Sequence, residues 1–385
     1  MSSKEWTTYR LGDICTDIAY GYTASADWQI EGPKFLRITD IQNYFINWEA
    51  VPQCPIKEND RKKYRLEIGD IVIARTGAST GSTFTLKDKI EAVFASYLIR
   101  YKINNEIANP FYIGYLLKST KWKEYVSSII GGSAQPGANA KQFADFDFIL
   151  PNDIKVQNGI VGILSSIDEK IENNLKTNQV LEEIALTIFK EWFINFNYPS
   201  SDGSRKHSEL GEVPSDWEVK TLGDVVEIKY GKDHKNLQSG NIPVYGSGGI
   251  MRFVDTALYE NESILIPRKG TLSNLFFVNS PFWSVDTMFY TKINLQKGGK
   301  YLFHLLQTLN LSSMNVGTAV PSLTTEILNR IVIAIPQIEV LSKFEEIVSN
   351  LSNKVKDNLA ENETLKITRD SLAPKLMSGE IALNG

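Results

Sequence analysis

The sequence predicts an α+β protein that contains two similar mixed α/β domains. Each domain is followed by a long helix, and the two helices are expected to form an antiparallel coiled coil. Two observations carry this prediction. The chain repeats its own motifs in the same order, and two segments share an apolar seam of alternating four- and three-residue steps. At 385 residues, the chain is long enough for about two to three ordinary domains. We expect four segments: a first domain at 1–151, a helix and joint at 152–208, a second domain at 209–336, and a helix and tail at 337–385.

Three motifs of the first half return in the second half. They are an opening with Trp and Leu-Gly-Asp, a strand-like apolar run ending in Arg, and a Gly-x-Ala-x-Pro sequence. The copies occupy 6–14 and 217–225, 70–77 and 263–270, and 132–136 and 317–321. Short β-branched and aromatic runs fill both domains, with helical stretches expected near 112–128 and 301–312. Each domain is therefore expected to hold more strand than helix.

A long helical pattern follows Pro151 and another follows Pro336. Shifted by 184 residues, 7 of the 22 positions from 160 to 181 are identical to those from 344 to 365. The two seams are Ile160, Leu164, Ile167, Ile171, Asn174, Asn178, Leu181, Ala185, Ile188 and Trp192, and Phe344, Val348, Leu351, Val355, Asn358, Asn362, Leu365, Arg369, Leu372 and Leu376. This is a coiled-coil period in two matching copies.

Two asparagines interrupt each seam. Polar seam residues cost stability and most often fix register, so we assign Asn174, Asn178, Asn358 and Asn362 to that role. An antiparallel pairing places Asn174 level with Asn362 and Asn178 level with Asn358. A parallel pairing would also match Asn with Asn, but the chain would then have to cross a whole domain between the helices. We therefore predict the antiparallel arrangement, with pseudo-twofold symmetry; the alternative is that each helix is a core helix of its own domain.

The two ends of this coil are not equivalent. Arg369 stands at the seam position where the first helix has Ala185. The segment 195–215, rich in Ser, Gly and Pro, is the expected joint from the first helix to the second domain.

The charge is distributed unevenly. Residues 1–151 carry 18 basic and 17 acidic side chains, and residues 209–336 carry 11 and 12. The segments 152–208 and 337–385 each carry 6 basic and 8 acidic side chains, which accounts for the net charge of −4. A general polyanion binder should have a basic excess. Binding to nucleic acid would therefore depend on local clusters or on a partner.

Two cysteines, no apolar segment of membrane length and no signal-like N-terminus favour a cytoplasmic protein without membrane association. No catalytic or metal-binding constellation stands out. The three histidines lack metal-ligand spacing, and residues 77–82 resemble a phosphate loop without its Lys. Asn109-Pro110-Phe111 falls one Pro short of an adenine-methyltransferase loop. We expect no enzyme activity, and no cofactor bound by this chain.

The features that remain in the sequence are typical of binding sites. Several loops combine glycine with hydroxyl, amide and basic side chains that can reach phosphates and base edges. The densest basic cluster, Arg61-Lys62-Lys63-Tyr64-Arg65, could clamp phosphates or could be a solvated loop. The DNA-binding candidates are Tyr20, Thr23, Ser25, Arg61, Lys62, Lys63, Arg75, Thr76, Ser79, Thr80, Gln135 and Asn139 in the first domain, and Lys232, His234, Lys235, Arg268, Lys269 and Ser273 in the second.

A repeated domain that ends in Pro and a coiled-coil helix resembles the specificity subunit of type I DNA restriction–modification systems. The resemblance covers essentially the whole chain. It is carried by Leu-Gly-Asp at 11–13 and 222–224, by the Gly-x-Ala-x-Pro motifs at 132–136 and 317–321, by the Pro-bounded helices, and by the closing residues 372–380. No single motif is strong, whereas their order and duplication are specific.

The resemblance implies two target-recognition domains, each reading one half of a bipartite double-stranded DNA site. It further implies that the helices act as spacer and as docking surface for two methyltransferase (M) subunits, with restriction–translocase (R) subunits joining the complex. S-adenosylmethionine, ATP and Mg would then be held by these partners. Two other readings stay open: a fused methyltransferase or nuclease, which would need a motif that is missing, and a protein–protein scaffold without direct DNA readout.

Overall fold

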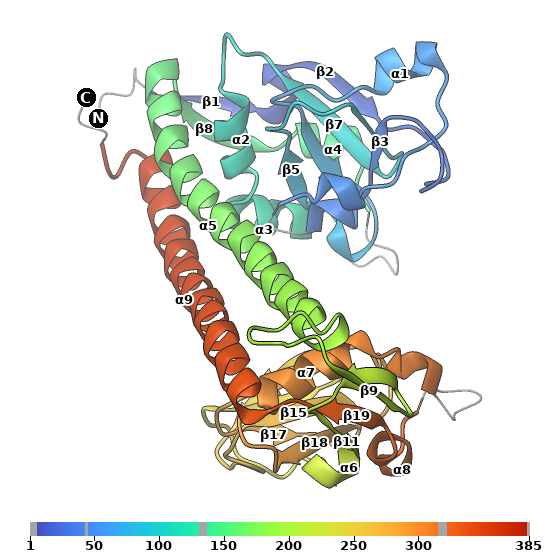
Figure 1. The fold of residues 1–385 in the computed structure, drawn as a ribbon. Coiled ribbons are helices and arrows are strands. Elements are labelled where there is room, and N and C mark those ends of the chain that lie inside the picture. The colour runs from blue at the N-terminus through green and yellow to red at the C-terminus, as the bar shows by residue number, and fades with distance from the viewer. Residues whose placement is uncertain (1–5, 43–44, 131–136, 315–321, 383–385) are drawn as a thin grey trace. The chain divides into compact units, whose positions relative to one another are not determined.

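The computed structural model describes residues 6–42, 45–130, 137–314 and 322–382, and it divides into two compact units. Unit 1 comprises Met1–Leu175 and Leu359–Gly385, and unit 2 comprises Lys176–Asn358. Both long helices continue from one unit into the other, so each unit contains one mixed domain and part of each helix (Figure 1).

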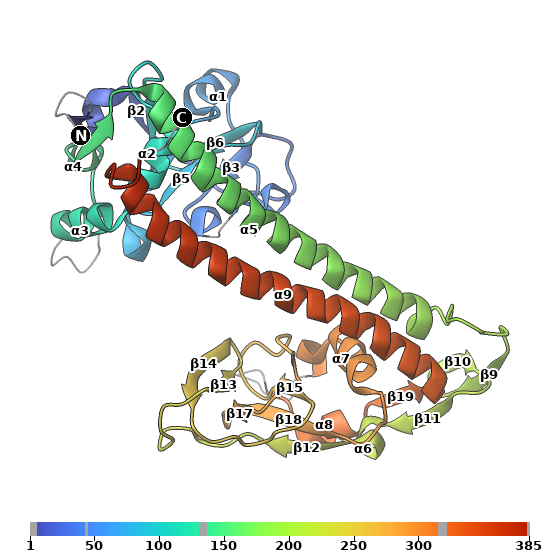
Figure 2. The same cartoon turned by 90° about the vertical axis from the view of Figure 1, so that its left-hand side faces the viewer.

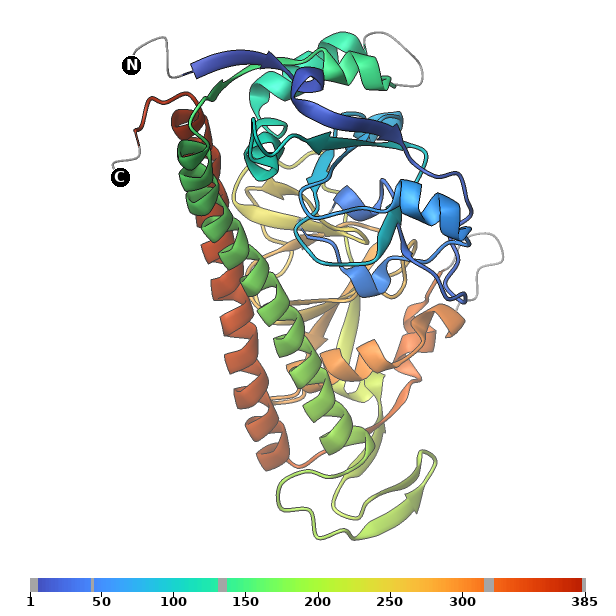
Figure 3. The same ribbon diagram turned by 90° about the horizontal axis from the view of Figure 1, so that it is seen from above.

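The main sheet of unit 1 is antiparallel, in the order β2-β7-β4-β5. Its centre is buried because β4 is a continuous apolar run, Ile-Val-Ile-Ala, with all four residues inaccessible to solvent. A parallel pair, β3 and β6, and an antiparallel pair, β1 and β8, complete the strands; Figure 3 shows β1 lying beside the strand that leads into α5. The strands are β1 (Trp6–Arg10), β2 (Cys15–Tyr20), β3 (Lys34–Leu36), β4 (Ile71–Ala74), β5 (Thr83–Thr85), β6 (Ala92–Phe94), β7 (Leu98–Ile103) and β8 (Asp147–Pro151).

Four short helices accompany this sheet: α1 (Glu58–Tyr64), α2 (Pro110–Leu116), α3 (Thr120–Ile129) and α4 (Ala140–Ala144). The single helical stretch expected near 112–128 is two helices. The break falls at Ser119, whose hydroxyl accepts a hydrogen bond from the backbone N–H of Trp122 at 3.2 Å and so caps α3. A continuous core joins the main sheet, α2, α3 and both long helices, from Ile71 and Tyr101 through Trp122 to Ile160 and Leu376.

Unit 2 repeats the strand pairing of unit 1. Its main sheet has the order β12-β18-β15-β16, its parallel pair is β13 with β17, and its antiparallel pair is β11 with β19. One addition is β14, which pairs with β13 as a hairpin, and another is the β9–β10 hairpin inside the expected joint. The elements are β9 (Arg205–Ser208), β10 (Gly211–Pro214), β11 (Glu218–Thr221), α6 (Leu222–Val225), β12 (Val226–Tyr230), β13 (Ile242–Gly246), β14 (Gly249–Val254), β15 (Ser263–Pro267), β16 (Phe276–Val278), β17 (Trp283–Ser284), β18 (Met288–Ile293), α7 (Gly299–Thr308), α8 (Thr325–Asn329) and β19 (Val332–Ile335).

The long helices are α5 (Ile154–Phe189), which ends in a π-helical turn at Lys190–Ile194, and α9 (Ile338–Met377). They run antiparallel within each unit (Figure 2). In unit 1, Ile160 and Leu376 belong to one core cluster; in unit 2, the rings of Trp192 and Phe344 lie 6.1 Å apart. No residue of either predicted seam is exposed. The predicted α+β class, with its internal repeat and antiparallel helix pair, is confirmed.

The asparagine layers lie in the buried seam. In unit 1, Asn174 Nδ2 donates to Asn362 Oδ1 at 2.9 Å, and in unit 2, Asn358 Nδ2 donates to Asn178 Oδ1 at 2.8 Å. All four side chains are buried. These are the two pairings that the antiparallel register requires. Each gives a buried asparagine oxygen a hydrogen-bond donor, whereas Asn178 Nδ2 has no partner among the described residues.

Candidate nucleic-acid interface

In unit 1, a tyrosine and an arginine meet at the end of the main sheet. Tyr20 is the last residue of β2, and Arg75 follows directly after β4. The Arg75 guanidinium lies 5.0 Å from the centre of the Tyr20 ring. The Arg75 backbone is fixed on both sides: its N–H donates to Tyr97 O at 3.0 Å, and its carbonyl accepts from Ala138 N at 3.0 Å. The side-chain Nε is buried and has no hydrogen-bond partner among the described residues.

Unit 2 builds the same pair. The Arg268 guanidinium lies 5.4 Å from the ring centre of Tyr230, the last residue of β12. Its N–H donates to Thr287 O at 2.9 Å, and its carbonyl accepts from Leu323 N at 3.0 Å. Here Nη1 also donates to Asp286 O, at 3.2 Å. Cation–π contact presents each guanidinium as a flat, oriented set of donors.

A glycine after each tyrosine makes this geometry possible. A Cβ on Gly21 would lie 2.1 Å from Ala95 O, and one on Gly231 would lie 2.0 Å from Val285 O. The N–H of Gly21 donates to Leu98 O at 3.1 Å, and that of Gly231 to Met288 O at 2.9 Å. Only glycine permits this approach of two backbones. Sequence analysis missed Tyr230, although the repeated Tyr-Gly at 20–21 and 230–231 could have found it.

Several other candidates of unit 1 gather around Tyr20. The Tyr20 hydroxyl accepts from Ala140 N at 3.0 Å, at the start of α4, and Thr76 forms a strand bridge with Gly137. The Asn139 side chain is engaged in capping α4, where its Oδ1 accepts from Gln142 N at 2.9 Å. Tyr20, Arg75, Thr76 and Asn139 therefore come together, although they are distant in sequence.

The remaining candidates of unit 1 are spread over three elements. Thr23 and Ser25 are exposed beyond β2, and Ser79 and Thr80 lie in the turn between β4 and β5, where the Thr80 hydroxyl donates to Gly77 O at 2.7 Å. Gln135 and both Gly-x-Ala-x-Pro motifs lie outside the described residues.

The basic cluster Arg61-Lys62-Lys63 is not the loop that we considered but belongs to helix α1. Arg61 forms ion pairs with Glu91 and, at 3.8 Å, with Glu58. Lys62 and Lys63 are exposed. The carboxylates around Arg61 offset part of the positive charge on which a phosphate clamp would depend.

In unit 2, three basic candidates follow Gly231. Lys232 and Lys235 are exposed, whereas His234 is half-buried and its Nδ1 has no hydrogen-bond partner among the described residues. Lys269 and Ser273 are exposed in the loop after Arg268. That loop contacts the β13–β14 turn, because Asn274 Nδ2 donates to Ser247 O at 2.9 Å.

Comparison with known proteins shows which family has this repeated architecture. Residues 3–183 and 214–369 match the type I restriction modification DNA specificity domain. The chain belongs to this family. It is 26% identical to the MjaIX specificity subunit of Methanocaldococcus jannaschii, over 98% of this chain and 94% of that protein. It is 23% identical to the HindI specificity subunit of Haemophilus influenzae, over 98% of this chain and all of that protein.

A solved structure agrees in fold. The type I restriction–modification S subunit of M. genitalium superimposes with a TM-score of 0.60 at 16% identity, covering 98% of this chain and 97% of that one. The two matched parts of the specificity-domain family each contain one Tyr–Arg pair, since Tyr20 and Arg75 fall in the first and Tyr230 and Arg268 in the second. The pair is thus a property of the repeated domain in this specificity-family chain.

Two further findings bear on chemistry. In the part of the chain that the structure describes, no three histidine, cysteine, aspartate or glutamate side chains gather into a group that could hold a metal ion. Among the same residues, no helix has the length and apolar character that crossing a membrane requires.

Proposed function

We propose that this chain is the DNA-recognition subunit of a type I restriction–modification complex. Each mixed domain reads one half of a bipartite site in double-stranded DNA. The helices set the spacing between the halves and dock two methyltransferase subunits, and restriction–translocase subunits join this assembly in the cytoplasm. The chain itself performs no catalysis. S-adenosylmethionine, ATP and Mg are held by the partners.

The observation that carries this proposal is the Tyr–Arg pair, built twice on the same backbone frame. A guanidinium is the side chain best suited to bidentate contacts with phosphate or with the guanine edge in the major groove. The buried, unbonded Nε of Arg75 is a donor that lacks a described protein partner and can serve a nucleic acid. Two equivalent sites in one chain match the two halves of a split recognition sequence.

The charge distribution supports the need for partners. The two domains are close to neutral, at 18 basic against 17 acidic and 11 against 12 side chains. Neutralising phosphates supplies much of the affinity of DNA-binding proteins. DNA-recognition domains without net charge therefore depend on the methyltransferase subunits for part of the positive surface around the duplex.

The long helices offer a surface for those subunits. Outside the seam, α5 exposes Val180 and Ile184, and α9 exposes Leu359 and Ile367, the last with 70% of its surface accessible. Large apolar side chains on the outer face of a helix pair are typical of protein contact sites.

Domain exchange tests the proposal. Residues 209–336 are replaced by the corresponding domain of a relative with a different site, and the methylated bases are mapped in DNA treated with the complete methyltransferase complex. We expect one half of the recognised sequence to change while the other half, read by residues 1–151, stays the same. The unchanged half is the internal control.

The alternative function is a protein scaffold without direct DNA readout. In that case the exchanged chain would assemble with its methyltransferase partners and leave both halves of the methylated sequence unaltered. A change in both halves at once would contradict independent reading by the two domains.

A further inference from the structure

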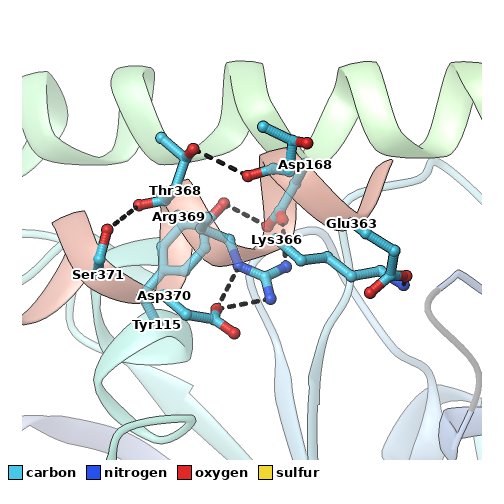
Figure 4. Close-up of polar contacts among 9 residues, drawn as sticks. Tyr115, Asp168, Glu363, Lys366, Thr368, Arg369, Asp370 and Ser371 are labelled. Atoms are coloured by element: carbon cyan, nitrogen blue, oxygen red, sulfur yellow. Dashed lines mark hydrogen bonds and ion pairs between the residues drawn. The ribbon is translucent and has the colours of Figure 1, made fainter. Parts of the chain in front are cut away.

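A charged cluster crosses the helix seam in unit 1. Arg369 Nη1 of α9 donates to Asp168 Oδ1 of α5 at 2.7 Å, and the Tyr115 hydroxyl donates to Asp168 Oδ2 at 2.7 Å (Figure 4). Arg369 also contacts its neighbour Asp370, through Nη2 at 2.7 Å and Nε at 2.9 Å. The side chains of Arg369 and Asp168 are only 19% and 22% exposed. Their ion pair is therefore shielded from water much better than an ordinary surface pair.

Unit 2 has no such ion pair at the matching place. The 184-residue shift between the helices relates Arg369 to Ala185 and Asp168 to Ser352. Ala185 is buried, and the Ser352 hydroxyl donates to Val348 O of its own helix at 2.7 Å. The cross-helix bond is thus confined to one end of an otherwise repeated seam.

This difference matters because the two helices are similar enough to pair in the wrong combination. In the observed register, paired residue numbers add up to 536, as Asn174 with Asn362 and Asn178 with Asn358 illustrate. The 184-residue shift converts each α9 number into its α5 equivalent. An α5–α5 pair between two copies of the chain therefore has residue numbers that add up to 352, and an α9–α9 pair has numbers that add up to 720. In the first, Asn174 meets Asn178 of the other copy; in the second, Asn358 meets Asn362.

An asparagine therefore faces an asparagine in every combination, and, apart from position 369, apolar residues face apolar residues. They fix the register, but they do not decide which helix pairs with which. The Arg369–Asp168 bond does distinguish the combinations. In an α5–α5 pair, Asp168 would face Ile184 or Ala185, and in an α9–α9 pair, Arg369 would face Leu351 or Ser352. Tyr115 and Asp370 remain with their partners in either case, so the contact that Arg369 and Asp168 lose is the one with each other. Another ion pair between the helices of unit 1, Lys170 with Glu361 at 3.1 Å, is much more exposed.

We infer that the Arg369–Asp168 ion pair makes α5 pair with α9 in preference to α5 of a second copy, and α9 with α5 in preference to a second α9. Two separate chains contain two such bonds, and a dimer that pairs α5 with α5 and α9 with α9 contains none. A polar group that is unfavourable only in the wrong partner combination is an established device of coiled-coil specificity. This selection between helices does not depend on DNA binding, so its test is separate from the test of the proposed function.

Unit 2 supplies the substitutions for the test. Arg369→Ala and Asp168→Ser, singly and together, give unit 1 the residues that unit 2 has. The reversed pair, Asp168→Arg with Arg369→Asp, restores the bond with opposite polarity. Lys366→Ala is the matched control, because it removes an ion pair, with Glu363 at 2.7 Å, that stays within α9.

The readout is the monomer–dimer equilibrium of the full-length chain by sedimentation equilibrium. If each lost bond is worth about tenfold, or about 1.4 kcal/mol, Arg369→Ala should lower the dimer dissociation constant by about a hundredfold. The reversed pair and Lys366→Ala should keep the wild-type value. Circular dichroism melting checks that each variant folds, and Asp168→Asn replaces any variant that does not.

Three results would overturn the inference. The first is a wild-type chain that dimerises as tightly as Arg369→Ala. The second is an Arg369→Ala chain that stays as monomeric as wild type. The third is a reversed pair that self-associates as strongly as the single variants, which would mean that the individual side chains matter and their bond does not.

Discussion

The two candidate sites at Tyr20–Arg75 and Tyr230–Arg268 share a backbone frame and differ in what surrounds it. Both have the Tyr-Gly step, the buried strand and the arginine over the tyrosine ring. In unit 2, however, β13 turns back into β14, which exposes Ile250, Met251 and Phe253, each with more than half of its surface accessible. In unit 1, the chain after β3 continues instead into Arg37, which is held by Asp40 at 2.8 Å and lies 5.7 Å from the ring of the exposed Trp28.

The backbone that positions each arginine is therefore distinct from the side chains that surround it. Hydrogen bonds between backbones hold Arg75 and Arg268 in equivalent places, independently of the neighbouring side chains. The neighbouring surface is apolar in one unit and contains a paired arginine and tryptophan in the other. Apolar side chains suit the methyl group of thymine, whereas charged and polar ones suit base donors and acceptors. One backbone frame thus presents two chemically different surfaces, as the proposed reading of two different half-sites requires.

The largest effect is expected from substitutions that disrupt the backbone frame shared by the two units. Gly21→Ala and Gly231→Ala would each place a methyl group about 2 Å from a carbonyl oxygen. Because backbone must move to relieve this clash, we expect each to lower the free energy of unfolding by about 3 kcal/mol. Urea unfolding measures the loss. Gly248→Ala is the control, since nothing lies within 4 Å of a Cβ there. Wild-type stability of either frame variant would refute the close approach.

The next prediction concerns pH. His304 packs among Phe189, Phe303 and Phe344, and burial lowers the pKa of its imidazole from 6.5 to about 4. The folded protein therefore holds this histidine neutral, while the unfolded chain takes up a proton below about pH 6.5. Its contribution to stability is complete above pH 6.5 and is lost as the pH falls towards 4, for a total of about 3 kcal/mol. We expect unit 2 to become acid-sensitive over this range.

The two units provide the comparison for that measurement. Tyr112 and Tyr301 are buried at matching places in α2 and α7, and three residues later unit 1 has Tyr115 where unit 2 has His304. Hydrogen exchange followed by peptide should show protection falling in unit 2 before unit 1 as the pH drops from 6.5 to 4. His304→Phe should remove the difference, and His207→Gln, at an exposed position, should not. Equal acid response of both units would count against the prediction.

Much of the fold could be predicted from the sequence, because period and repetition are local properties. The seam positions, the asparagine partners and the order of the repeated motifs follow from spacing alone. The sites could be predicted only in part. Arg75 and Arg268 stand out after buried strands and the repeated Tyr-Gly marks Tyr230, but the contact between Tyr230 and Arg268 depends on the folded sheet, in which β18 lies between β12 and β15.

Other errors have the same physical origin. The polar run at 58–64 has no apolar face, so its helix depends on contacts such as the ion pair of Arg61 with Glu91 on another segment. Asn139, a DNA-binding candidate, also caps α4, a role that the Gln three residues later could have indicated. Arg369 marked the two coil ends as different, whereas its partner Asp168 was not apparent before the fold placed them together.

A smaller effect is expected from the arginines themselves, and it should be confined to one half-site each. Arg75→Ala and Arg268→Ala should each weaken DNA binding by the methyltransferase complex by about tenfold, within the 1–3 kcal/mol typical of a bidentate base contact. Arg75→Ala should lose discrimination in one half only, and Arg268→Ala in the other. Duplexes with a single altered half-site distinguish the two. Arg330→Ala is the control, because that arginine is paired with Glu326 on the surface of α8. Loss of both halves from one substitution would contradict the separation of the sites.

The smallest expected effect separates the two tyrosines. The Tyr20 hydroxyl accepts a hydrogen bond from Ala140 N at 3.0 Å and so ties β2 to the start of α4. Within the described part of unit 2, the Tyr230 hydroxyl has no recorded hydrogen bond, although its ring holds Arg268 in the same way. Tyr20→Phe should therefore lower the free energy of unfolding by about 0.5–1 kcal/mol, whereas Tyr230→Phe should change it by less than about 0.5 kcal/mol. Because both variants keep the aromatic face under the guanidinium, DNA binding should persist in both. Paired urea titrations measure the difference, and equal losses in the two variants would show that the hydroxyl contributes nothing specific to unit 1.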